Sequence, residues 1–136
     1  MSFKSFEELD CWKACREIQR FIKPIIKKLP PEEKFDLADN MKRAARSSSR
    51  NIAEGFGRYS FQENARFSII SRGSLYEVID DLITCYEEEY ITTEEYSNGR
   101  KLIDKAIAFV NGYINYLERA KVNKSKISEN QEPYNL

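Results

Sequence analysis

Apolar residues recur at helical spacing along most of the chain, and no stretch alternates as a strand would. The pattern divides into four segments, at about residues 6–28, 31–57, 60–89 and 92–121. The first carries Cys11, Trp12, Ala14, Cys15, Ile18, Phe21, Ile22, Ile25 and Leu29, and the second Leu37, Met41, Ala44, Ala45, Ser48 and Ile52. The fourth carries Leu102, Ile103, Ala106, Ile107, Phe109, Val110, Tyr113, Ile114 and Leu117. Each segment therefore predicts an amphipathic helix.

The segments begin and end at recognisable signals. Capping boxes, in which a hydroxyl and a carboxylate three residues later bond to each other's amides, are expected at Ser5 and Glu8, Ser60 and Glu63, and Thr92 and Glu95. Pro24 should bend the first helix, and Pro31 suits the first turn of the second. Four long helices joined by short turns predict an all-α fold, an antiparallel up-down-up-down four-helix bundle.

The predicted bundle occupies residues 1–120, a length sufficient for one domain with a buried core. After Lys121 the sequence becomes polar and loses its periodicity. We therefore expect residues 121–136 to form a disordered C-terminal tail.

The apolar face of the third helix is unusually wide. It comprises Ile69, Leu75, Tyr76, Val78, Ile79, Leu82, Ile83 and Tyr86. At about 100° per residue these positions cover roughly half of the helix circumference. One neighbouring layer needs less, so we expect a homo-oligomer.

Composition argues against an enzyme. The chain has no histidine, which removes the commonest general base. Cys11 and Cys15 share one helical face, but neither a second thiol pair nor a histidine is present to complete a metal site. We therefore expect Cys11, Cys15 and Cys85 to be buried apolar residues, and no catalytic residue, metal or cofactor.

The hydropathy pattern also bears on location. No apolar run reaches the length of about 18 residues that a membrane span needs. The first ten residues lack the apolar core of a signal peptide. The expected location is the cytoplasm.

Charge is segregated although the net charge is zero. Residues 40–72 contain seven basic and two acidic residues, whereas residues 77–104 contain nine acidic and two basic ones. Two basic stripes lie opposite the apolar faces of the first two helices: Lys13, Arg16, Arg20, Lys23 and Lys27, and then Lys42, Arg43, Arg46 and Arg50.

Three interpretations of the stripes remain open. They could bind a phosphate backbone, or be a solvated surface, which charge alone favours. They could also contact the acidic face of another subunit in a ring. Its acids would be an outward set on the third helix, Glu77, Asp80, Asp81 and Glu88.

One set of motifs is specific enough to identify a family. It consists of Lys42-Arg43-Ala44-Ala45-x-Ser47, Asn51-Ile52-Ala53-Glu54-Gly55, Gly57-Arg58, Ser60 and Gly73-Ser74-Leu75-Tyr76-Glu77. Phe6-Glu7-Glu8-Leu9 and Trp12-Lys13 precede it. Over about residues 3–118 the chain resembles the 23S rRNA intervening-sequence protein family, small bacterial four-helix-bundle proteins.

The resemblance implies a non-enzymatic protein linked to RNA or the ribosome. Related retroelement accessory variability proteins form homopentameric rings that engage a reverse transcriptase and nucleic acid, so a pentamer is expected here. Those proteins are markedly basic, whereas this chain is neutral, which weakens the retroelement interpretation. The alternative is a protein-protein interaction or accessory module without nucleic-acid affinity.

Two sets of site residues follow. The candidates for binding nucleic acid are Lys42, Arg43, Arg46, Arg50 and Arg58, with the stripe from Lys13 to Lys27 as a second set. The motif residues Asn51, Glu54, Gly55, Gly57, Gly73, Ser74 and Glu77 are expected to be mainly structural. We expect the glycines to end the second helix or allow close packing. The polar motif residues should bond to the backbone, to Arg58 or to a neighbouring helix.

Overall fold

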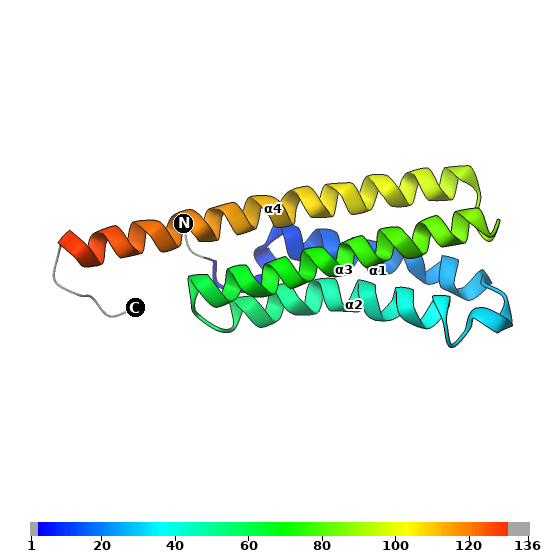
Figure 1. Ribbon diagram of the computed structural model, residues 1–136, viewed down its shortest axis with the longest axis horizontal. Helices are drawn as coiled ribbons and strands as arrows, with labels where there is room; N and C mark the ends of the chain where they lie inside the picture. The colour runs from blue at the N-terminus through cyan, green and yellow to red at the C-terminus, as the bar shows by residue number, and fades with distance from the viewer. Residues whose placement is uncertain (1–2, 131–136) are drawn as a thin grey trace.

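The computed structural model describes the backbone of residues 3–130 and the side chains of residues 3–124. Four helices lie side by side as an elongated bundle (Figure 1): α1 (Asp10–Lys28), α2 (Leu37–Phe56), α3 (Phe61–Glu87) and α4 (Thr93–Asn130). Two 3-10 turns, η1 (Phe6–Glu8) and η2 (Pro31–Glu33), precede α1 and α2. In this part of the chain no helix is long and apolar enough to cross a membrane.

Helices that are consecutive in the sequence are neighbours in space. Contacts join α1 to α2, α2 to α3 and α3 to α4, and α4 returns to α1. Figure 1 shows the α1–α2 and α3–α4 connections at one end of the bundle and the α2–α3 connection at the other. The up-down-up-down arrangement predicted from the sequence is confirmed.

The core follows the predicted apolar faces closely. All six positions predicted to face inward from α2 are buried, and Met41, Ala45 and Ile52 have no measurable exposure. Phe109 of α4 is an exception, since 39% of it is exposed. The wide face of α3 divides into a buried part that includes Leu75 and an exposed part: Ile69, Tyr76 and Tyr86.

Small hydroxyl side chains join α2 to α3. Ser71 Oγ donates to the Ser48 carbonyl at 2.7 Å, and the hydroxyls of Ser47 and Ser74 lie 2.8 Å apart. Ser48 and Ser71 are completely buried, so these hydrogen bonds satisfy groups that water cannot reach. Short side chains let the two helices approach closely, and the bonds fix how far one is shifted along the other.

The helix starts differ from the prediction in four places, and the first is that residues 6–8 form the separate turn η1, so that α1 begins only at Asp10. Thr92 and Glu95 form the complete capping box, but Ser60 forms only its own half, because the Glu63 carboxylate turns to Arg66. At Ser5 the predicted box is wrong, since its hydroxyl accepts from the Glu7 amide. The second helix begins at Leu37 rather than with Pro31, because Pro31 starts the separate turn η2.

Helix α4 continues past the expected end at residue 121. Its backbone is helical to Asn130, and Figure 1 shows it extending beyond the other three helices. Propagating an established helix costs little, so a polar segment can continue one that packing has already formed. Residues 131–136 of the predicted tail lie outside the described residues.

Candidate nucleic-acid interface

A groove lined by basic side chains runs between α1 and α2. Its middle section has a volume of about 410 Å³. Apolar residues of the lining are Ile22, Ile26 and Ala45, and the cations come from both helices: Arg16, Arg20, Lys23 and Lys27 of α1 with Lys42 and Arg46 of α2. The two stripes identified separately in the sequence therefore form one surface.

The groove continues past its middle section in both directions. Toward the end of α2, Arg16 and Arg46 also line the next section, together with Trp12 and Arg50. Toward the α1–α2 connection, Lys27 and Lys42 are shared with a section that contains Phe35. These shared residues make the three sections neighbours along one side of the α1–α2 pair, and together they are called here the α1–α2 groove.

The cations of the α1–α2 groove have no acidic partners. In residues 3–124, whose side chains are described, five ion pairs are found, and none uses any of these side chains: Arg16, Arg20, Lys23, Lys27, Lys42, Arg46 and Arg50. Close like charges along a concave surface raise the local positive potential, which attracts anions even when the whole chain is neutral. The α1–α2 groove is therefore the strongest candidate for an anion-binding surface.

A hydrogen-bonded side chain fixes the two walls of the groove relative to each other. Gln19 on α1 donates through Nε2 to the Ala45 carbonyl at 3.2 Å and to Ser49 Oγ at 2.6 Å. Both acceptors belong to α2. The spacing between the cations on the two helices is thus set by a direct contact.

Three predicted basic residues lie elsewhere. Lys13 does not line any of the three sections. Arg43 pairs with Asp39 at 3.4 Å. Arg58 pairs with Glu54 at 3.0 Å, at the turn between α2 and α3. The structure brings Lys42, Arg46 and Arg50 of the predicted set together and separates Arg43 and Arg58 from them.

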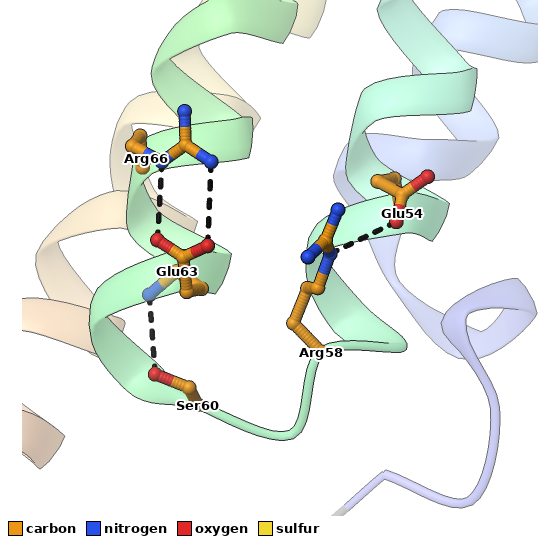
Figure 2. A network of polar contacts seen from close by, with 5 residues as sticks. All are labelled: Glu54, Arg58, Ser60, Glu63 and Arg66. Carbon is orange, nitrogen blue, oxygen red and sulfur yellow. Dashed lines mark hydrogen bonds and ion pairs between the residues drawn. The ribbon is translucent and has the colours of Figure 1, made fainter.

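Figure 2 shows the ion pairs at the α2–α3 turn. Arg58 reaches back to Glu54, while the Glu63 carboxylate accepts from Arg66 and the Glu63 amide donates to the hydroxyl of the capping residue, Ser60. The guanidinium groups of Arg58 and Arg66 also lie 5.0 and 4.7 Å from the centre of the Phe67 ring. These pairs are exposed, so screening by water leaves them only a small contribution to the stability of the turn.

Comparison with known proteins assigns the family. A family model described as the 23S rRNA-intervening sequence protein matches residues 7–112, from η1 into α4. The chain belongs to the 23S rRNA-intervening sequence protein family. The family resemblance stated from the sequence motifs is therefore confirmed. A comparison with curated proteins finds no significant match.

The glycines of the family motifs differ in their surroundings. A methyl group on Gly55 would lie 2.9 Å from Asn64 Oδ1 and from Phe67 Cβ, so α2 needs glycine there to approach α3. Close packing was predicted at Gly73, which is wrong, since nothing lies within 4 Å of that position. Gly57 ends α2 with a φ of −72°, and the left-handed residue of the turn is Tyr59, at +54°.

The polar motif residues mostly bond to helix neighbours. Asn51 donates to the carbonyl and the hydroxyl of Ser47 at 2.8 and 2.9 Å, and Ser47 in turn contacts Ser74 of α3. Glu54 forms the predicted pair with Arg58. Glu77 is exposed and forms no hydrogen bond within the described residues, so its predicted bond to a neighbouring helix is wrong.

The three cysteines are buried free thiols, as predicted. Burial raises the pKa of Cys11 to about 12 and that of Cys85 to about 11. The reactive thiolate is therefore scarce at neutral pH. Within the described residues, no group of three or more Cys, Asp or Glu side chains is placed to hold a metal ion.

Asp81 is buried, contrary to its predicted place in an outward acidic set. Only 6% of it is exposed, and its carboxylate accepts from Asn40 Nδ2 at 2.7 Å. Desolvation raises the pKa of Asp81 to about 6, while the bond from Asn40 lowers it and nearby Asp80, Glu77 and Asp36 raise it. Helical periodicity places Asp81 near the boundary between the buried and exposed faces of α3. At such a position, packing against α2 decides whether the side chain is buried.

Replacing Asp81 by asparagine should stabilise the protein at neutral pH. The carboxyl of Asp81 has a higher pKa in the folded protein, about 6, than in an unfolded chain, about 3.9. Its stabilising contribution is therefore complete below about pH 4 and is lost as the pH rises through about 6. We expect Asp81→Asn to raise the free energy of unfolding by roughly 1–3 kcal/mol at neutral pH and to flatten its fall between about pH 4 and 6.

Urea unfolding at several pH values measures this effect, with Asp80→Asn as the exposed control. An Asp81→Asn protein with the pH profile of the wild type would contradict the prediction.

Proposed function

We propose that this protein is a non-enzymatic RNA-binding bundle that holds phosphates in the α1–α2 groove. The observation that carries the proposal is that seven cations from two helices line one groove without an acidic partner among the described side chains. Phosphate contacts from lysine and arginine supply most of the affinity in sequence-independent binding. RNA is the preferred polyanion because the family takes its name from an rRNA intervening sequence.

The groove has the length that several phosphates need. From Arg16 to Lys27 the α1 wall extends about 17 Å at ~1.5 Å per residue. A wall of that length can contact several successive phosphates of one strand. Because the net charge of the chain is zero, the whole molecule adds no attraction for RNA. RNA should therefore bind at the groove only.

The salt dependence of binding tests this function. Fluorescence anisotropy of a labelled RNA oligonucleotide is expected to show tight binding at low salt. The logarithm of the binding constant should fall against the logarithm of salt with a slope of about −3, for four or five contacts at ~0.7 each. The absence of binding to structured and single-stranded RNA at low salt would refute the proposal.

The same proposal includes a homo-oligomer, with five copies favoured by the family resemblance. The exposed apolar part of α3 supports it, since Ile69 and Tyr76 lie two helical turns apart and are 45% and 57% exposed. Light scattering should give about five times the chain mass of 16.0 kDa. A mass of one chain at micromolar concentration would contradict it.

A protein-interaction module without nucleic-acid affinity is the second candidate, and the same exposed part of α3 favours it. Such a module should retain one stoichiometric protein partner after nuclease treatment and should not bind RNA. Either function would operate in the cytoplasm, the location that we propose from the sequence.

A further inference from the structure

An exposed aromatic ring lies at one end of the α1–α2 groove. Phe35 is 85% exposed and lines the groove section of about 420 Å³ beside the α1–α2 connection. Lys34 Nζ lies 5.3 Å from the centre of its ring. The rest of this section is largely apolar: Ile26, Leu29, Pro30, Pro31 and Ala38. A flat apolar surface therefore adjoins the cations of the groove, two of which, Lys27 and Lys42, line both sections.

The segment that carries Phe35 is held in place by backbone and side-chain bonds. The Lys34 amide donates to the Pro31 carbonyl at 3.2 Å, and the Asp36 amide donates to the Glu33 carbonyl at 3.1 Å. Tyr90 donates to the Glu33 carboxylate at 2.9 Å and so ties the segment to the α3–α4 connection. The ring is thus presented outward from an anchored turn.

The carboxylates of Asp39 and Glu33 do not prevent an anion from binding at the Phe35 end of the groove. Asp39 is the one carboxylate that lines this section, and it pairs with Arg43. Glu33 accepts from Tyr90 instead of lining the groove. The cations Lys27, Lys34 and Lys42 therefore outnumber the carboxylate in the lining.

The dimensions of the groove favour a single strand over a duplex. Packed helices lie about 8–10 Å apart, so a groove between two of them admits one backbone but not a whole duplex. The apolar side chains of the middle section cannot bind phosphates, but they can contact bases. They are Ile22, Ile26 and Ala45. Bases are free to make such contacts in single-stranded RNA, whereas a helix encloses them.

We propose that the α1–α2 groove binds single-stranded RNA, with a base stacked on Phe35 and the adjoining phosphates held by Lys27 and Lys42. This inference rests on the proposed RNA-binding function and adds the class of RNA and a residue that contacts the base. Aromatic side chains beside a cationic track are how sequence-tolerant single-strand binders hold bases.

Phe35→Ala tests the stacking contact. It is expected to weaken binding of a labelled oligouridine about tenfold, within the range for loss of one stacked base. Phe35→Trp should keep the affinity of the wild type, because tryptophan also stacks. Tyr59→Ala is the matched control, since Tyr59 is 91% exposed but lies at the opposite end of α2, outside the groove. An abasic oligonucleotide should bind wild type and Phe35→Ala equally, and an RNA duplex should bind the wild type more weakly than oligouridine does.

The outcomes separate this inference from the proposed function. Salt-dependent RNA binding that Phe35→Ala leaves unchanged would overturn the stacking contact and keep the function. Equal or tighter binding of a duplex would overturn the single-strand preference. A Phe35→Ala protein with a changed oligomer mass and unchanged RNA affinity would place a second copy on the ring instead. No binding of any RNA would refute both proposals.

Discussion

Reversing the charge of Lys42 and Arg46 together is expected to weaken RNA binding about 100-fold at 50 mM salt. Each phosphate contact of a single strand contributes on the order of tenfold at that salt concentration through counterion release. Both side chains line the middle section of the α1–α2 groove and are exposed, so glutamate can replace them without disturbing the core. The salt dependence should also become less steep, by roughly 1.4 in slope for two lost contacts.

The matched control reverses two arginines outside the groove. Arg43→Glu with Arg58→Glu changes the net charge by the same amount, but both arginines are paired with carboxylates of α2. We expect at most about a threefold loss of affinity, since neither arginine lines the groove and exposed charges that make no direct contact are weakened by salt screening. An equal loss in the two double variants would mean that RNA responds to overall charge, and would refute the groove as the site.

Adding one methyl group at Gly55 should destabilise the bundle, whereas the same change at Gly73 should stabilise it. At Gly55 the new carbon would lie 2.9 Å from Phe67 Cβ and 3.1 Å from Asn64 Cα. The Asn64 backbone cannot move without shifting α3, and such overpacking costs about 1–3 kcal/mol. At Gly73 nothing lies within 4 Å, so alanine gains up to about 1 kcal/mol of helix propensity.

Urea unfolding of Gly55→Ala and Gly73→Ala should therefore give free energies that differ by roughly 2–4 kcal/mol. Far-ultraviolet circular dichroism of both variants checks that each remains helical. Equal stability of the two variants would show that α2 and α3 can separate at Gly55 at little cost.

The sequence predicted the fold well because the buried face of an amphipathic helix follows mainly from the periodicity of its apolar residues. Every inward position predicted for α2, from Leu37 to Ile52, is buried. Capping depends on finer local geometry, which is why the Thr92 box forms and the Ser5 box does not. Helical spacing of small residues cannot say which glycine meets a neighbour, so close packing was expected at Gly73 and the end of α2 at Gly55, whereas the close contact lies at Gly55, inside α2.

The candidate site was predicted only in part. Periodicity gives the angular position of a side chain on its own helix, but not how two helices are rotated about their axes. It therefore identified Arg16 and Arg46 on separate stripes without showing that they line one groove. Phe35 had no pattern signal, since a single aromatic near the start of the second predicted segment resembles an ordinary core residue until its exposure is known.

The separation of charge in this neutral chain has a consequence for how it meets a partner. The cations of the groove belong to α1 and α2, whereas α3 carries exposed acids such as Asp80 and Glu87, and this separation makes the molecule an electric dipole. An approaching polyanion turns such a molecule before touching it, so that the α1–α2 side leads and the acidic side is turned away. The fraction of collisions that are productive should therefore be high at low ionic strength. It should fall steeply as salt shortens the range of the field.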